Sequence, residues 1–190
     1  MGHLEIEFKT LLSVKDYKWL MQQYFQTSQM ISQENIYIDT DDFALRERRM
    51  MLRIRRIEDI YIMTLKKQIT HGVLEFDGTI DSPALNTHID YIPHNILDQF
   101  HAHSIDSGAL RIQGQLHTYR LEHTIAAGLL VLDKSEYCGI VDYELEFEAH
   151  DYDAGKAFFD EFLSDHNIAK RSDIPKSERF YRTLYKEKEA

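Results

Sequence analysis

Apolar and polar residues alternate along eight segments of the chain. The first segment, residues 3–11, reads HLEIEFKTL, so that apolar and charged side chains occupy opposite parities. A β-strand points successive side chains to opposite faces, and this pattern therefore predicts a strand with one apolar and one charged face. The segments with this pattern are 3–11, 35–40, 51–58, 60–68, 73–80, 115–125, 128–137 and 140–149.

Four other segments carry apolar residues at helical spacing. The first follows Ser13, which resembles the first residue of a capping box, and the second covers about 90–102, with Pro93 in its first turn. The third follows Asp153 as N-cap, and the last begins near Ser177. We interpret their apolar stripes as core positions, namely Tyr17, Leu20, Met21 and Tyr24 in the first helix, Ala157, Phe158 and Phe162 in the third, and Phe180, Tyr181, Leu184 and Tyr185 in the last.

Eight strands in sequential runs predict an α+β fold, with an eight-stranded antiparallel β-barrel and helices packed outside it. If the polar faces met water, the apolar faces would fill the barrel and the helices would have nothing apolar to cover. We therefore expect the apolar faces to lie beneath the helices and the charged faces to line the interior. A length of 190 residues and the lack of a Gly/Ser-rich linker predict one domain over residues 1–190.

Composition narrows the functional classes. The formal net charge of −10, from 32 acidic and 22 basic residues, disfavours general nucleic-acid binding. A single cysteine, Cys138, excludes an intrachain disulfide and fits a reducing cytosol, and no apolar run has the length of a membrane span. We expect a cytoplasmic protein with neither nucleic acid nor membrane as partner, and the sequence leaves monomer and homodimer open.

The polar faces separate by charge. Carboxylates lie on the first and last strands, and cations lie on the middle ones. A charged interior is costly unless its charges are paired or bind a charged ligand. Carboxylates suit Mg²⁺ or Mn²⁺, and Arg and Lys suit phosphate oxygens. A polyphosphate that chelates a divalent cation requires carboxylates for the cation and Arg or Lys for the phosphates. The carboxylates are Glu5, Glu7, Glu144 and Glu146, and the cations are Arg53, Arg55, Lys66 and Arg120.

Six short motifs, in order from residue 5 to residue 181, resemble the CYTH family, also called triphosphate tunnel metalloenzymes. The segment EIEFK (Glu5, Glu7, Lys9) is similar to the ExExK signature of the family, and IYIDTDDFAL to its YxDT segment. LRIR and TLK resemble its paired arginines and central lysine, YELEFE its late ExE strand, and KSERFY its terminal Lys-Ser segment at Lys176. Within the family, the chain looks most like the small stand-alone members of low-GC Gram-positive bacteria.

The resemblance implies a barrel that binds a triphosphate with Mg²⁺ or Mn²⁺ and hydrolyses its terminal phosphate, with inorganic tripolyphosphate as the expected substrate. Thiamine triphosphatases and class IV adenylyl cyclases also belong to the family, so that cyclisation of ATP, or binding of a polyphosphate without turnover, stays open. The implied catalytic residues are Glu5, Glu7 and Lys9. The implied substrate-binding residues are Lys9, Arg53, Arg55, Lys66, Glu75, Arg120 and Lys176, and the implied metal ligands are Glu5, Glu7, Glu144 and Glu146.

Several residues keep two interpretations. Glu148 shares the parity of Glu144 and Glu146, so either neighbouring pair could match the ExE strand. Asp133 is a metal ligand, a group beside the metal, or half of an ion pair. Asp39 either supports the site or ends a strand at a turn. The i, i+2 spacing of His101 and His103 disfavours a zinc site on a helix.

Overall fold

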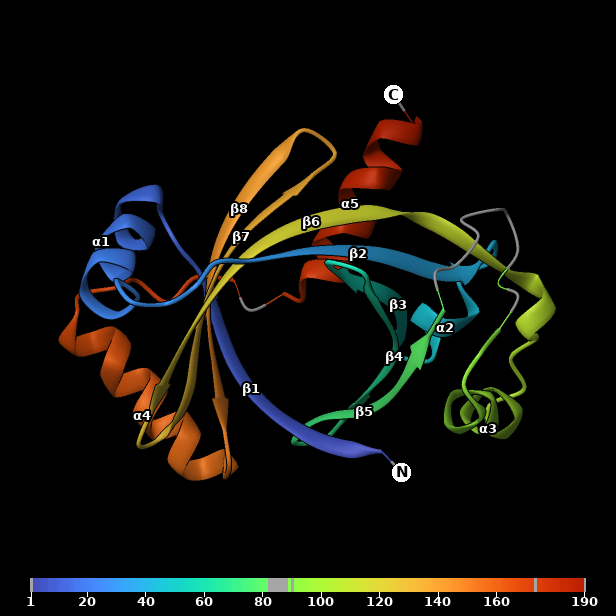
Figure 1. Ribbon diagram of the computed structural model, residues 1–190, viewed down its shortest axis with the longest axis horizontal. Helices are drawn as coiled ribbons and strands as arrows, with labels where there is room; N and C mark the ends of the chain where they lie inside the picture. Colours follow the sequence, from blue (N-terminus) through green and yellow to red (C-terminus); the bar gives the residue numbers. More distant parts are fainter. Residues whose placement is uncertain (1, 82–88, 90, 173, 190) are drawn as a thin grey trace. The chain divides into compact units, whose positions relative to one another are not determined.

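Eight strands and five α-helices make up the fold in a computed structural model that describes residues 2–81, 89, 91–172 and 174–189, with side chains to residue 184. The strands form one closed barrel in the order β1-β5-β4-β3-β2-β6-β7-β8 (Figure 1). The predicted α+β barrel is therefore confirmed. The strands are β1 (His3–Leu11), β2 (Ile31–Thr40), β3 (Met50–Ile57), β4 (Ile60–Ile69), β5 (Gly72–Ile80), β6 (Leu110–Ile125), β7 (Gly128–Tyr137) and β8 (Ile140–Ala149).

The chain divides into two compact units. The first unit comprises Met1–Leu4 and Gln33–Leu116, and the second unit comprises Glu5–Ser32 and His117–Ala190. Each unit has its own apolar core. The single domain expected over residues 1–190 stays a prediction.

In the first unit, the apolar faces of the strands pack against α2 (Ala44–Glu47) and α3 (His94–Ala102). A short 3-10 helix, Ser107–Ala109, precedes β6. The buried core includes Ile36, Leu52, Ile54, Met63 and Leu65 from strands, and Leu45, Ile96 and Phe100 from helices. Arg53 and Arg55 have the opposite parity on β3 and are only half-buried. The apolar faces thus lie beneath the helices, as expected.

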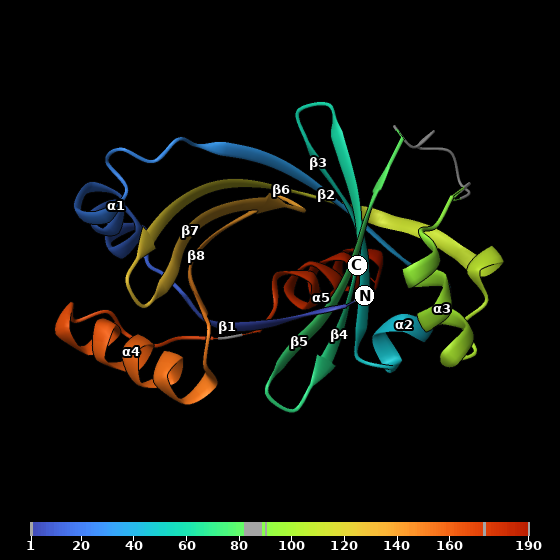
Figure 2. The same cartoon turned by 60° about the horizontal axis from the view of Figure 1, so that its bottom comes forward.

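The second unit follows the same plan with α1 (Val14–Tyr24) and α4 (Tyr152–Asp165), which contact β8 (Figure 2). Its last helix is α5 (Lys176–Glu189). The buried core includes Leu121, Leu130, Leu132, Leu145 and Phe147 from strands, and Tyr17, Leu20, Phe159, Phe162 and Leu163 from helices. Arg120, Asp133, Glu144 and Glu146 have the opposite parity and are buried as well. Both faces of this sheet are therefore buried, and the polar face is not an ordinary water-facing surface.

The predicted start of α4 is wrong by two residues. Asp151 rather than Asp153 is the N-cap, because its carboxylate accepts a hydrogen bond from the backbone N–H of Ala154 at 2.9 Å. The buried face of α4 also differs from the prediction. Ala157, predicted as core, is exposed, and Phe159 is buried instead.

The other predicted helices agree more closely with the structure. Ser13 caps α1 as expected, and its Oγ accepts from the backbone N–H of Asp16 at 3.1 Å. The helix expected over 90–102 begins at His94, since Pro93 has an extended backbone (ψ 140°) and forms the N-cap instead of the first turn. Residue 90 and the side chain of Tyr185 lie outside the described part of the chain.

Asp39 closes the turn between β2 and α2. Its buried carboxylate accepts backbone hydrogen bonds from Thr40 (2.8 Å), Leu45 (2.9 Å) and Arg46 (3.1 Å). Burial raises the pKa of Asp39, and these hydrogen bonds offset part of the rise. Of the two interpretations of Asp39, the structure supports the turn.

Replacing Asp39 with alanine is expected to lower the free energy of unfolding by about 2–4 kcal/mol, because buried N–H groups would lose their acceptor. Urea denaturation measures the change, and Asp41→Ala, at an exposed position two residues away, is the matched control. Equal midpoints for the two variants would contradict this role of Asp39.

Candidate active site

The strand register of the second unit places opposite charges side by side. Lys9 on β1 lies opposite Glu146 on β8. Arg120 on β6 lies opposite Asp133 on β7, which in turn lies opposite Glu144 on β8. Directly paired residues have Cβ atoms about 5 Å apart, so their side chains meet on the same face. The sheet therefore gathers Lys9 and Arg120 with three carboxylates, Asp133, Glu144 and Glu146, on one face.

Arg120 joins two of the carboxylates. Its Nε and Nη2 donate to the two oxygens of Asp133 at 2.9 and 2.7 Å, and Nη2 also donates to Glu146 at 2.7 Å. Asp133 is fully buried, and Arg120 is 9% exposed. This bidentate geometry fixes the plane of the guanidinium group.

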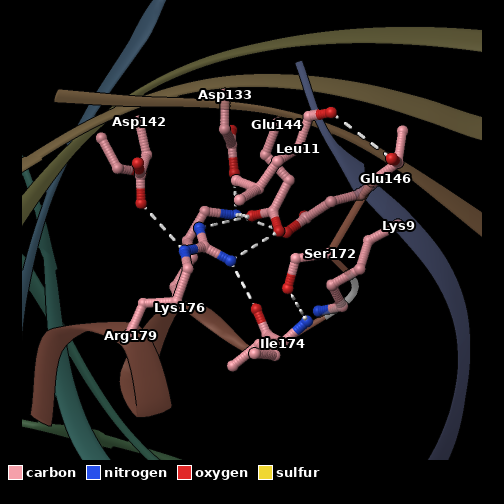
Figure 3. Close-up of polar contacts among 12 residues, drawn as sticks. Lys9, Leu11, Asp133, Asp142, Glu144, Glu146, Ser172, Ile174, Lys176 and Arg179 are labelled. Atoms are coloured by element: carbon pink, nitrogen blue, oxygen red, sulfur yellow. Dashed lines mark hydrogen bonds and ion pairs between the residues drawn. The ribbon is translucent and has the colours of Figure 1, made fainter. Parts of the chain in front are cut away.

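The first turn of α5 adds two further cations (Figure 3). Lys176 Nζ lies 2.7 Å from Asp133 and 2.5 Å from Glu144, and it also contacts Glu146. Arg179, one helical turn later, donates to Glu144 at 3.0 Å and to Asp142 at 2.9 Å. We call this set the charge cluster, and it consists of Glu7, Lys9, Arg120, Asp133, Asp142, Glu144, Glu146, Lys176 and Arg179.

The charge cluster holds Lys176 and Glu146 ionised. Burial lowers the pKa of Lys176, but Asp133, Glu144 and Glu146 outweigh this effect and raise it well above its usual value. Burial raises the pKa of Glu146, but Lys176, Arg120 and Lys9 outweigh it and keep the pKa well below 4.5. Buried charges of both signs stay fixed in place when each is compensated in this way.

Carboxylates crowd one another at the neighbouring end of β1 and β8. Glu7 lies opposite Glu148, and Glu7 also forms an ion pair with Lys9. Burial, followed by the charge of Glu5, raises the pKa of Glu148 to about 7. Negative charge is therefore in excess at this position, which favours a bound cation.

The first unit contains the remaining predicted residues. Lys66 lies opposite Glu75 and forms an ion pair with it. Arg55 donates from Nε to Asn35 at 3.1 Å. Within the described residues, Nε of Arg53 is buried without a hydrogen-bond partner, and a buried donor of this kind is uncommon.

The predicted residues thus fall into two groups. The second unit brings together Glu7, Lys9, Arg120, Glu144, Glu146 and Lys176. Glu5 acts through its charge on the neighbouring Glu148. The first unit pairs Lys66 with Glu75 and places Arg53 and Arg55 on β3. Sequence reasoning missed Arg179 and Asp142, although Arg179 follows Lys176 at the i, i+3 spacing that marks one helical face.

Comparison with known proteins decides the family. The family model described as "CYTH domain" matches residues 3–181. The chain belongs to the CYTH family. A Bacillus subtilis (strain 168) protein described as "Putative triphosphatase YjbK" is 36% identical over 179 residues, which cover 94% of each protein.

Solved structures agree with the CYTH fold. A crystal structure described as "a putative adenylate cyclase" from Bacillus halodurans is 34% identical, covers 95% of this chain and 98% of its own, and has a TM-score of 0.86. A Hippeastrum protein described as "Putative adenylyl cyclase HpAC1" is 21% identical, covers 94% and 96%, and has a TM-score of 0.78, which supports the fold alone. No helix in the described part of the chain has the length and apolar character to cross a membrane.

The donor groups of this CYTH chain fit the divalent cation that the family resemblance implies. Glu5, Glu7, Glu144 and Glu146 offer only carboxylate oxygens, which suit hard cations such as Mg²⁺ and Mn²⁺. Glu144 and Glu146 are nearly fully buried, at 1% and 4% exposed, and hydrogen bonds fix their directions. Positioned oxygen donors of this kind can bind a metal.

Proposed function

We propose that this CYTH chain hydrolyses the terminal phosphoryl group of a linear triphosphate, with inorganic tripolyphosphate as the first candidate. The observation that carries the proposal is the charge cluster, in which Lys and Arg side chains are paired with carboxylates. The cations suit phosphate oxygens, and the carboxylates suit the divalent ion that accompanies a triphosphate. Family membership and the triphosphatase description of the 36% identical relative support the same conclusion.

Lys9, Arg120 and Lys176 are assigned to the phosphate oxygens of the substrate. Each is already oriented by carboxylates, so little reorganisation is needed when the substrate binds. Arg120 would contact a phosphate oxygen through its remaining guanidinium N–H groups, because Nε and Nη2 already donate to Asp133 and Glu146. The two lysines would act as point charges. Most of the catalytic effect would come from placement and charge, as in other phosphoryl transfers.

Arg53, Arg55 and Lys66 of the first unit keep their predicted role as phosphate-binding residues. The buried Nε of Arg53 is a donor that a phosphate oxygen would satisfy. Glu75 would act through Lys66, whose ammonium group it holds. Glu75 is therefore a positioning residue in this proposal, since two anions do not bind each other.

Glu5, Glu7, Glu144 and Glu146 would hold Mg²⁺ or Mn²⁺. Such an ion supplies charge neutralisation to the phosphates and lowers the pKa of a bound water. Lys9, which lies between Glu7 and Glu146, would keep a positive charge beside the transferred phosphoryl group, because Glu7, Glu146 and Glu144 raise its pKa despite burial. Glu5, Glu7 and Lys9 are the residues proposed to act in the chemical step.

Two other activities use the same groups. The 34% identical relative is described as a putative adenylate cyclase, which favours ATP cyclisation as the second candidate. A domain that binds a triphosphate without turnover is the third. A small-molecule partner and a cytoplasmic location accompany all three.

A product assay separates these activities. Tripolyphosphate, thiamine triphosphate and ATP are each incubated with Mg²⁺ or Mn²⁺, and phosphate, pyrophosphate and cyclic AMP are measured. We expect tripolyphosphate to give equal amounts of phosphate and pyrophosphate, faster than the other substrates give products. Cyclic AMP as the main product would overturn the hydrolase proposal, and so would a thermal shift with tripolyphosphate but no product from any substrate.

A further inference from the structure

Three side chains with metal-ligand chemistry meet in the first unit. Glu75 and Asp77 lie at positions i and i+2 of β5 and therefore share a face, and His3 comes from β1, the neighbouring strand. His3 Nε2 is 3.5 Å from Glu75 Oε2, and His3 Nδ1 is 3.6 Å from Asp77 Oδ2. One ligand atom from each of the three residues lies within 4.8 Å of the other two.

The two contacts reach different nitrogens of the ring, and neither has the length of a hydrogen bond. A hydrogen bond between nitrogen and oxygen has a length of about 2.7–3.2 Å, so neither carboxylate is hydrogen-bonded to the imidazole. Ligands at roughly 2.1 Å from one ion lie about 3–4 Å apart, depending on the angle between them. An ion bound through one ring nitrogen would have one oxygen of Glu75 and one of Asp77 near it, since one ligand atom from each of the three residues lies within 4.8 Å of the other two.

Neighbouring side chains orient both carboxylates toward His3. Thr64 Oγ1 donates to Asp77 Oδ1 at 2.6 Å, which leaves Oδ2 directed at the imidazole. Lys66 pairs with Glu75 Oε1, which leaves Oε2 directed at the same ring. Partners that hold the outer oxygen of a ligand are typical of built metal sites.

The backbone before His3 is also held close to β5. A Cβ atom on Gly2 would lie 2.8 Å from the Phe76 ring and 3.1 Å from the carbonyl oxygen of Glu75. Only glycine permits this approach without a shift of the strand. His3 is exposed and Glu75 is buried, so a cation from solvent can reach a site whose inner ligand is fixed.

We propose that His3, Glu75 and Asp77 bind a divalent transition-metal ion. An imidazole with two carboxylates suits Zn²⁺ or Mn²⁺, whereas Mg²⁺ prefers oxygen ligands alone. The proposal uses residues of the first unit only, and none of the four carboxylates assigned above to the triphosphate-bound metal. It therefore does not depend on the proposed hydrolysis.

Zn²⁺ calorimetry on chelator-treated protein without a histidine tag tests this proposal. We expect His3→Gln and Asp77→Asn each to weaken the binding of one Zn²⁺ equivalent by at least tenfold. His101→Gln, which changes an exposed histidine of α3 in the same unit, should bind as the unchanged protein does. Circular dichroism checks that all variants are folded. Unchanged Zn²⁺ affinity in folded His3→Gln would reject the site and leave His3 as an ion-pairing residue.

A spectroscopic measurement separates this site from the all-carboxylate site. Bound Cu²⁺ should give electron spin echo modulation from an imidazole nitrogen. The modulation should disappear in His3→Gln and persist in Glu7→Gln, which alters only the proposed triphosphate-bound metal. Persistence of the nitrogen signal in His3→Gln would overturn the assignment of His3 as a ligand.

Discussion

Replacing Lys176 with methionine is expected to lower the free energy of unfolding by about 3–5 kcal/mol at pH 7, because it leaves buried carboxylates without their shared cation. Lys176 contacts Asp133, Glu144 and Glu146, and its side chain is 13% exposed. Methionine keeps the length of the side chain, so the change removes charge rather than volume. Urea denaturation in the presence of a chelator measures the effect.

The loss of free energy of unfolding in the Lys176→Met variant should depend on pH. The pKa of Asp133 and of Glu146 lies below 3.8 and 4.5 respectively, because Lys176 and Arg120 outweigh the effect of burial. A carboxylate with a lowered pKa stabilises the fold above its unfolded pKa, and this contribution is lost as pH falls through the folded pKa. The Lys176→Met variant lacks that contribution. The difference in free energy of unfolding between the variant and the unchanged protein should therefore become smaller below about pH 4.5.

Lys156→Met provides the matched control. Lys156 pairs with Asp160 on the surface of α4 and is more than half exposed, so its replacement should leave the urea midpoint unchanged. A Lys176→Met variant that unfolds with the midpoint of this control would show that the carboxylates do not depend on Lys176.

Changing Glu7 to glutamine is expected to reduce tripolyphosphate hydrolysis by roughly two orders of magnitude or more, comparable to the loss of one strong electrostatic contributor. Glutamine preserves the size of Glu7 but removes the charge that a metal ligand needs. The loss should be largest at limiting Mg²⁺. Initial rates of phosphate release, measured over a range of Mg²⁺ concentrations, give the result.

The control for this change is Glu161→Gln on the exposed side of α4. Both variants should show native circular dichroism, so that a lower rate reports on the site rather than on folding. Normal turnover by Glu7→Gln at limiting Mg²⁺ would remove Glu7 from the proposed metal ligands while leaving the phosphate-binding residues untouched.

Strand alternation predicted most of the fold because these strands carry apolar residues on one face and polar residues on the other. β1, β7 and β8 match their predicted ranges, and β2 and β6 begin earlier than expected, at Ile31 and Leu110. The early part of β6, LRIQG, alternates over residues 110–113 and then meets Gly114, a residue that weakens a strand pattern. Asp151 and Asp153 could both cap α4, and only the backbone geometry distinguishes them.

Side-chain parity predicted which residues of the site share a face, but it could not give their partners. Asp133 had two interpretations in the sequence, and the strand register places it between Arg120 and Glu144 as part of an ion-pair network. Glu148 is opposite Glu7, which no sequence pattern reveals because β1 and β8 are far apart in the chain. The short contacts of His3 with Glu75 and Asp77 are likewise a product of pairing between distant strands.

The second unit combines an early and a late segment of the chain, Glu5–Ser32 and His117–Ala190. Contacts between these segments can form only after the late segment has been synthesised. Residues 33–116 of the first unit are contiguous and can leave the ribosome together, whereas β1 cannot pair with β8 until residue 149 has been made. Lys176 and Arg179 are added later still, after every carboxylate that they neutralise. A nascent chain that has stopped before residue 176 therefore carries Asp133, Glu144 and Glu146 without the cations of α5. The residues that follow the strands, and not the completion of the strands, supply the missing charge balance of the second unit.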